Sequence, residues 1–165
     1  MIKMKKTLTI FTVLGVLLFM GCGDGEKKNT DPYEKSTPTE QTKVVSSVPA
    51  SQRVDLTNKG IGPIKNVELG ETIDMEMAAK GEEVYKMNCT ACHKVDKKFI
   101  GPAPKGILER RTPEWVMNMI LNPDVMTKDD PLAHDLLLEF NGSPMANQQM
   151  SEEQARQMLE YFRTL

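Results

Sequence analysis

The chain of 165 residues is poor in the residues that build most small catalytic or metal sites. It has three cysteines, two histidines and one tryptophan, and aromatic residues make up 5% of it. So few cysteines exclude a disulfide-rich scaffold, and there is no second Cys or His pair to complete a zinc ribbon. Neither a Ser/His/Asp arrangement nor an internal repeat is visible. A net charge of −2 also gives no basic surplus for binding nucleic acid.

Three of these rare residues stand in one run, Cys89-Thr90-Ala91-Cys92-His93. The spacing C-x-x-C-H is that of a covalently attached c-type haem. Two thiols three positions apart on a helical turn can add to the two vinyl groups, and the next imidazole then lies under the iron. A thioredoxin-like site would need a hydrophobic strand before the motif, and the preceding residues offer none. The sequence therefore predicts one covalent haem c per chain, bound through Cys89, Cys92 and His93.

The third cysteine follows a segment typical of exported proteins. Residues 1–21 contain three early lysines and then an apolar stretch too short for a comfortable transmembrane helix. The end of this stretch, Phe19-Met20-Gly21-Cys22, resembles a bacterial lipobox with Phe where Leu is usual. We expect residues 1–21 to be a lipoprotein signal peptide and Cys22 to carry the lipid. The alternative is an uncleaved anchor. Both place the rest of the chain outside the cytoplasm, held to a membrane and facing the periplasm.

Composition divides the remainder into three parts. Residues 22–52 are rich in Thr, Ser, Pro, Lys and Glu with hardly any apolar periodicity, which predicts a disordered, flexible tether. Residues 53–74 have short apolar groups separated by Gly and Pro, so we expect an irregular arm laid over the next domain. Residues 75–165 form the predicted folded domain.

Caps and apolar periods predict an all-α domain, since little of it alternates like a strand. The expected helices run from Met75 to Met87 and into the Cys motif, from Pro113 to a stop at Asn122-Pro123, from Pro131 to Phe140, and from a capping box at Ser151-Glu152-Glu153-Gln154 to Phe162.

These elements resemble the class I cytochrome c family over residues 75–165. Gly81 and Tyr85 look like the Gly-x-x-x-aromatic pair by which that family's first helix crosses its last helix, here at Tyr161 and Phe162. The resemblance implies a small cytochrome c fold of three to five helices around one covalent haem.

The Gly101-Pro102 pair is similar to the Gly-Pro that follows the haem motif in this family. The resemblance implies that the Pro102 carbonyl accepts a hydrogen bond from the proximal imidazole of His93 and thereby orients it. The alternative is a simple turn.

The resemblance also suggests the second axial ligand of the iron. Met145, in an extended loop shortly before the last capped helix, takes the place of the family's distal methionine, although Pro-Met-Ala stands where Met-Pro is usual. Met126, in the loop after Pro123, His134 and an open site are the alternatives. Trp115 is expected either to hydrogen-bond a haem propionate or to be a core aromatic.

A Met/His haem in a small domain supports one-electron transfer rather than enzymatic catalysis. We therefore expect an electron carrier in an extracytoplasmic respiratory chain, with redox proteins as partners and no small-molecule substrate. The alternative is a haem enzyme or sensor with an open distal site. The carrier would connect a quinol-oxidising complex to a terminal oxidase or a periplasmic reductase. Residues 109–115 are similar to monohaem cytochromes that accompany nitrous oxide reductase.

Charge is divided unevenly along the domain. Residues 86–111 have a balance of +5, whereas residues 112–165 have a balance of −6. Such a dipole can orient the domain when it meets an oppositely patterned redox partner. The alternative is an ordinary solvated surface.

Overall fold

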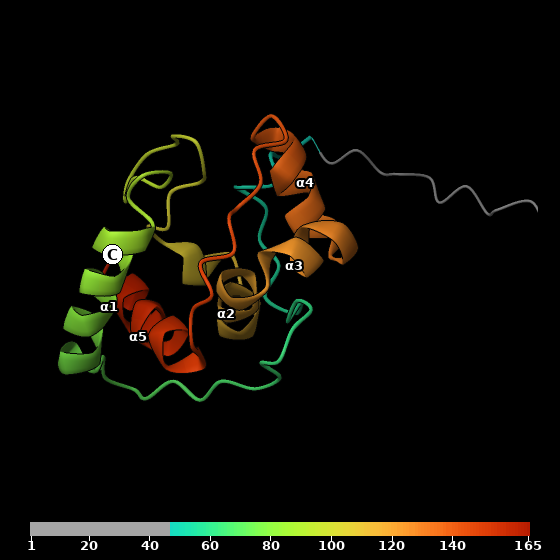
Figure 1. The fold of residues 1–165 in the computed structure, drawn as a ribbon. Helices are drawn as coiled ribbons and strands as arrows, with labels where there is room; N and C mark the ends of the chain where they lie inside the picture. The colour runs from blue at the N-terminus through green and yellow to red at the C-terminus, as the bar shows by residue number, and fades with distance from the viewer. Residues whose placement is uncertain (1–46) are drawn as a thin grey trace, which may run out of the picture. The chain divides into compact units, whose positions relative to one another are not determined.

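A computed structural model describes residues 47–165 of the chain. The predicted signal peptide, Cys22 and most of the predicted tether lie outside the described residues. The described part is helical without strands, so the all-α prediction is confirmed (Figure 1). Its elements are α1 (Met75–Asn88), the 3₁₀-helix η1 (Ile107–Glu109), α2 (Pro113–Leu121), α3 (Pro123–Asp129), α4 (Pro131–Glu139) and α5 (Glu152–Arg163).

The helix starts follow from local capping chemistry. Thr112 accepts a hydrogen bond from a first-turn backbone N–H of α2 at 3.1 Å, and Asp130 does the same for α4 at 2.8 Å. At α5 the capping box is complete, since Ser151 and Gln154 bond each other's backbone N–H at 3.1 Å and 3.0 Å. These side chains satisfy donors that a helix leaves unpaired at its N-terminus. The starts predicted from the sequence are confirmed.

The helix α3 was not predicted. We interpreted Asn122-Pro123 as a helix stop followed by a loop, but proline is equally suited to the first position of a new helix, where no N–H is needed. Pro123 begins α3 in this way. Met126 is therefore a helical residue. It is fully buried, and its Sδ accepts a hydrogen bond from the Ile61 N–H at 3.0 Å.

The first and last helices cross at a small residue and a group of aromatic rings. Gly81 lies against the backbone of α5 at Gln157. The Tyr85 ring packs beside Tyr161 at a centroid distance of 5.4 Å and edge-on to Phe162 at 5.9 Å. A missing Cβ permits the close approach of the two backbones, and the rings fill the space next to it. The predicted crossing of α1 and α5 is confirmed.

An irregular arm precedes α1 and is fastened to α2 by polar side chains (Figure 1). The buried Asn118 amide donates to the carbonyls of Lys59 and Ile64 at 3.0 Å and 2.9 Å, and it accepts from the Ile64 N–H at 3.0 Å. Glu114 accepts from the Val67 N–H at 3.1 Å. Backbone groups that have no strand partner are thus satisfied by α2.

The packed part of the chain begins earlier than the predicted tether boundary at residue 52. Ala50 is only 4% exposed and belongs to the apolar core. The neighbouring Ser51 donates from both its backbone N–H and its hydroxyl to the Glu139 carboxylate, at 2.8 Å and 2.6 Å. The composition of this segment resembles that of a linker, but its contacts are with α4, which is distant in the sequence.

Candidate functional site

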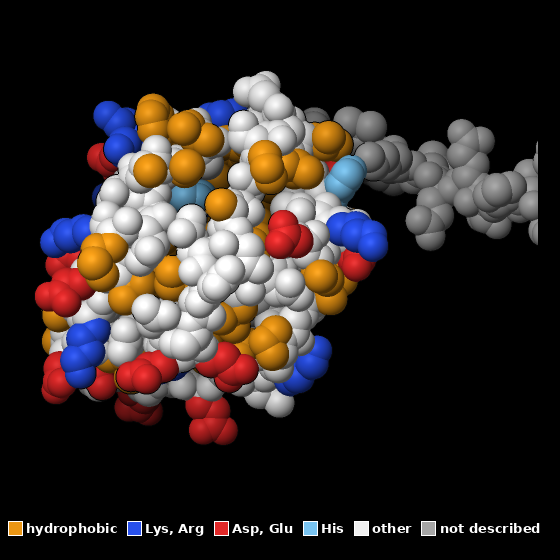
Figure 2. All heavy atoms as spheres, in the orientation of Figure 1, with side chains coloured by type: hydrophobic (Ala, Val, Ile, Leu, Met, Phe, Trp, Pro, Cys, Tyr) orange, Lys and Arg blue, Asp and Glu red, His pale blue; other side chains and the backbone are white. Residues whose placement is uncertain are grey.

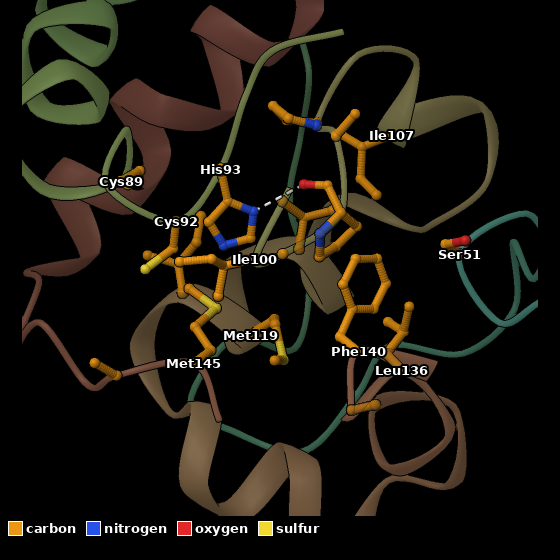
Figure 3. A pocket seen from close by; sticks show the side chains of 18 of the residues that line it. Ser51, Cys89, Cys92, His93, Ile100, Ile107, Met119, Leu136, Phe140 and Met145 are labelled. Carbon is orange, nitrogen blue, oxygen red and sulfur yellow. Dashed lines mark hydrogen bonds between the residues drawn. The ribbon is translucent and has the colours of Figure 1, made fainter. Parts of the chain in front are cut away.

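An apolar cavity of about 210 Å³ lies between the Cys motif and the other elements of the domain (Figure 3). Its lining residues come from every helix of the domain and from the loops after α1 and α4. The apolar side chains of the wall include Ile100, Pro104, Ile107, Val116, Met119, Ile120, Leu136, Leu137, Phe140, Met145, Met150, Met158 and Phe162. Such a lining suits a largely apolar ligand.

The Cys motif continues the turn geometry of α1 into this cavity. The Cys89 N–H donates to the Tyr85 carbonyl at 2.9 Å, and the N–H groups of Cys92 and His93 return to the Cys89 carbonyl at 3.1 Å and 2.8 Å. These bonds hold the motif in compact turns, so all three chemical groups lie along one wall. Cys89, Cys92 and His93 all line the cavity.

The imidazole of His93 is oriented by a backbone carbonyl. Its Nδ1 lies 2.8 Å from the Pro102 carbonyl oxygen, as the dashed line in Figure 3 shows. A carbonyl only accepts, so Nδ1 carries the proton and donates. In the neutral imidazole Nε2 is then the unprotonated nitrogen, which is the form that binds a metal ion. The Gly101-Pro102 pair thus has the geometry that the family resemblance implied.

Gly101 is required by the imidazole itself. A Cβ added there would lie 2.4 Å from Cε1 of His93 and within 2.9 Å of both ring nitrogens. The backbone is kept near the ring because the Gly101 N–H donates to the Cys92 carbonyl at 2.9 Å. Nothing in the sequence alone showed this contact, since it depends on how the loop returns to the motif.

Tyr85 holds the backbone of the haem motif in place at His93. Its hydroxyl donates to the His93 carbonyl at 3.1 Å. Burial, and to a lesser degree Cys89 and Tyr161, raises the pKa of Tyr85 to about 12. The phenol therefore remains protonated at every physiological pH and keeps this hydrogen bond.

The thiols do not have the environment of a redox-active pair. Burial, followed by the neighbouring Cys92, raises the pKa of the Cys89 thiol to about 11. Thiol–disulfide enzymes instead lower this pKa so that the thiolate is available at neutral pH. Within residues 47–165 there is also no group of three or more His, Cys, Asp or Glu side chains arranged to hold a metal ion.

The candidates for the second axial ligand differ in where they lie. Met145 lies on the extended segment between α4 and α5, lines the cavity and is directed into it in Figure 3. Met126 is buried under the arm, outside the cavity wall. His134 is bonded through Nδ1 to the Thr127 carbonyl at 3.1 Å and also lies outside the wall. Of these three, Met145 alone shares a cavity with His93.

Of the two roles expected for Trp115, the structure favours the core aromatic. The indole lines the cavity and is 3% exposed, but its single N–H donates to the Asp130 carboxylate at 3.2 Å. The same carboxylate caps α4. Trp115 therefore acts as a core aromatic that ties α2 to α4, because its only donor is already used.

Two arginines of the wall, Arg110 and Arg111, were counted in the sequence only as surface charge. Both line the cavity, and Arg111 is 1% exposed. The Nε atoms of both are buried without a hydrogen-bond partner. Donors left unpaired in a cavity wall, together with the space that Gly101 leaves and the free Nε2 of His93, fit a bound haem with its anionic groups.

Comparison with known proteins places this geometry in a family. The family model for cytochrome c matches residues 78–165. A solved structure of cytochrome c from Rhodothermus marinus is 42% identical, with a TM-score of 0.61, covering 70% of this chain and 92% of that one. An engineered form of the Rhodothermus protein, bound to a carbene intermediate, is 41% identical with a TM-score of 0.58, covering 70% and 93%.

A shorter match joins the chain to cytochrome c2 of Rhodopseudomonas palustris, which is 50% identical over 34 residues. That match spans 21% of this chain and 29% of the relative. The family model, in contrast, spans more than half of the chain and includes the whole Cys-x-x-Cys-His motif and all five α-helices except the start of α1. The chain therefore belongs to the cytochrome c family, and its cofactor is covalently attached haem c.

Proposed function

We propose that the protein is a one-electron carrier whose haem iron is bound by His93 and Met145. The observation that carries this proposal is the position of both side chains in one apolar cavity, with the His93 imidazole fixed through Nδ1. Haem c, when bound, supplies an iron that takes up and releases one electron without bond making in a substrate. Membership of the cytochrome c family supports electron transfer of this kind.

The chain's own groups would set the chemistry of the iron. The Pro102 carbonyl fixes the His93 ring and raises the basicity of Nε2. A thioether at Met145 favours the ferrous state and so raises the reduction potential. The wall around the two ligands is mainly apolar, which favours electron transfer over the binding of a polar substrate. An enzyme or sensor would instead need an open distal position, which requires Met145 to stay off the iron.

A redox partner would meet the protein at the basic loop, which we define as residues 94–106. Phe99 and Ile100 are 50% and 48% exposed there, directly after the haem motif. Lysines surround them, and the Lys94 ammonium lies 5.0 Å from the centroid of the Phe99 ring. In Figure 2 hydrophobic side chains gather at the upper left of the face with basic ones beside them, and several acidic side chains lie along its lower edge. This polarity supports a partner with an acidic docking surface.

Raising the salt concentration tests this docking surface. We expect electron transfer to an acidic redox partner to slow at least about tenfold between about 10 mM and 150 mM salt, because the Debye length falls from about 30 Å to about 8 Å. A Lys97→Gln/Lys98→Gln variant should have a weaker salt dependence, measured by stopped-flow absorbance. A Lys65→Gln/Lys80→Gln variant removes the same charge elsewhere and should behave as the native protein. Rates independent of salt would contradict the proposed docking surface.

We also propose that the protein works as a periplasmic lipoprotein attached through Cys22. The signal segment and the lipobox-like residues support this location. No helix among residues 47–165 has the length and apolar character to cross a membrane. The partners would then be a quinol-oxidising complex and a terminal oxidase or periplasmic reductase, with nitrous oxide reductase as one candidate. Mass spectrometry of the mature N-terminus tests the anchor, and an unmodified Cys22 would contradict it.

A further inference from the structure

The helix α4 forms one side of the haem cavity but has little support from the other helices. Leu136, Leu137 and Phe140 of this helix line the cavity. Among the helices of residues 47–165, α4 packs extensively only against α3, and the two lie apart from α1 and α5 (Figure 1). The N-terminal end of α4 is tied to α2, because the Trp115 indole donates to Asp130. Its C-terminal end needs another anchor.

The arm supplies this anchor through residues 50–58, which we call the strap. Three polar residues of the strap each bind one carboxylate of α4 or of its N-cap. The pairs are Asn58 with Asp130 at 2.7 Å, Arg53 with Asp135 at 2.7 Å, and Ser51 with Glu139 at 2.8 Å from its N–H and 2.6 Å from its hydroxyl. Residue numbers fall along the strap as they rise along α4, so the two segments run antiparallel and are joined along the whole helix.

The strap is itself fixed to the segment that precedes α2. The Asp55 N–H donates to the Arg110 carbonyl at 2.9 Å. The Thr112 hydroxyl donates to the Asn58 carbonyl at 2.6 Å. The strap therefore connects α4 to the start of α2, which lies on another side of the cavity.

The segment that bears Met145 depends on α4 for its position. Between residues 144 and 150 its only hydrogen bond with the described part of the chain runs from the Gln149 N–H to the Asn147 side chain, at 2.9 Å. Its start is bonded to α4, since the Gly142 N–H donates to the Leu137 carbonyl at 2.8 Å. Its end is fixed at the capping box of α5. A displacement of α4 would therefore move the segment at its start.

The basic loop makes a weaker contact with the same end of α4. The Lys98 ammonium lies 4.4 Å from the centroid of the Phe140 ring and 3.5 Å from the Glu139 carbonyl oxygen. Lys98 is exposed, so water and salt screen this contact. Ser51 instead directs two short hydrogen bonds at a charged carboxylate, and such bonds are the stronger kind. The strap is thus the main polar anchor of this end.

We propose that Ser51 and Arg53 are positioning residues for the second axial ligand. Through Glu139 and Asp135 they hold α4 against the cavity, and α4 sets the start of the segment that bears Met145. The side chains of Arg53 and Asp135 are 28% and 29% exposed, and ion pairs as open as this contribute little to global stability. Loss of the strap bonds should therefore loosen α4 locally and leave the domain folded.

The test is amide hydrogen exchange in the intact haem protein, followed by NMR in the ferrous, diamagnetic state. The N–H groups of Phe140 and Gly142 report on the end of α4, because they donate to the Leu136 and Leu137 carbonyls at 3.0 Å and 2.8 Å. In Ser51→Ala/Arg53→Gln we expect both to exchange about tenfold faster than in the native protein, since local opening becomes easier. The Cys89 N–H at the end of α1 should keep its native rate.

Lys80→Gln is the matched control. It removes an ion pair of the same kind on α1, where Lys80 lies 2.9 Å from Glu76. This variant should leave the exchange of Phe140 and Gly142 unchanged. The proposal is overturned if Ser51→Ala/Arg53→Gln matches the control. It is also overturned if exchange at Cys89 rises equally, because the strap would then support the whole domain rather than α4.

A double-mutant cycle keeps the test available if the strap variant does not fold. Arg53→Gln and Asp135→Asn each change one partly exposed side chain of the same pair. Each should speed the exchange of Phe140, and the two together should have little more effect than either alone, because they break one contact. Fully additive effects would contradict a contact between strap and helix.

This inference rests on the proposed function, because it assigns the strap to Met145 as the second axial ligand. Imidazole, which competes for that position, should bind the ferric iron of Ser51→Ala/Arg53→Gln faster than that of the native protein. Faster amide exchange with an unchanged imidazole rate would overturn the positioning of Met145. An open distal site in the native protein would remove the proposed function, whereas the exchange measurement would still report whether the strap holds α4.

Discussion

Replacing Met145 by leucine is expected to lower the reduction potential of the haem protein by about 0.1–0.3 V, a substantial part of the ~0.8 V range that axial ligands span. Leucine has nearly the volume of methionine, so the cavity wall should stay packed while the sulfur is lost. The drop in potential follows because the thioether stabilises ferrous iron more than ferric iron. Potentiometric titration followed by visible absorbance measures it.

Met119→Leu is the matched control for this change. Met119 lines the same cavity but projects from the helix α2. Its sulfur should pack in the cavity wall without binding the iron. The variant should therefore keep the native reduction potential within about 0.05 V, a small fraction of the axial-ligand range. Equal potentials for the native protein and Met145→Leu would contradict the ligand assignment. A large drop in Met119→Leu alone would transfer the role to Met119.

Replacing Gly81 by alanine is expected to destabilise the domain by about 3 kcal/mol or more. The added Cβ would lie 2.0 Å from the Gln157 carbonyl oxygen and 2.8 Å from the Met158 nitrogen. These are backbone atoms of α5, so no side-chain rotation relieves the clash, and the two helices must separate. The separation would also disturb the Tyr85 ring, which supports the haem motif. Denaturant unfolding of the ferric protein measures the loss.

The direction of the stability change in Gly81→Ala distinguishes a close helix crossing from an ordinary exposed helix. In an exposed helix, Gly→Ala stabilises by about 1 kcal/mol, because alanine has the higher helix propensity. Gly70→Ala serves as the control, since a Cβ there meets its nearest atom at an ordinary 3.4 Å. It should change stability by less than about 0.5 kcal/mol. A Gly81→Ala protein as stable as the native one would show that the α1 and α5 backbones are not in close contact.

Features set by neighbouring residues could be predicted from the sequence. The crossing of α1 and α5 was implied by the family resemblance, whereas the haem motif and the three capped helix starts depend on residues within a few positions of each other. Motif spacing and helix caps are local signals, so they can be identified from the sequence itself. The missed helix α3 belongs to this group as well, because Pro123 at a first helical position is a start signal that we interpreted only as a stop.

Features set by distant partners could not be predicted. The indole of Trp115 is a plausible propionate donor until the fold brings Asp130 within 3.2 Å. The residues around Ala50 have the composition of a linker. The Ala50 carbonyl nevertheless accepts a hydrogen bond from Arg111, which is distant in the sequence. Arg111 itself appeared only as one unit of positive charge. A backbone carbonyl has no sequence signature, so bonds to carbonyls across the domain become visible only in the structure.

The most direct test of the His93/Met145 centre is the ligand state of the native haem protein in solution. We expect the ferric protein to have the weak near-infrared charge-transfer band of methionine bound to ferric iron, and the ferrous protein to bind carbon monoxide slowly or not at all. Absence of the band together with rapid carbon monoxide binding would show an open distal position. That result would contradict the proposed electron carrier and favour an enzymatic or sensory role.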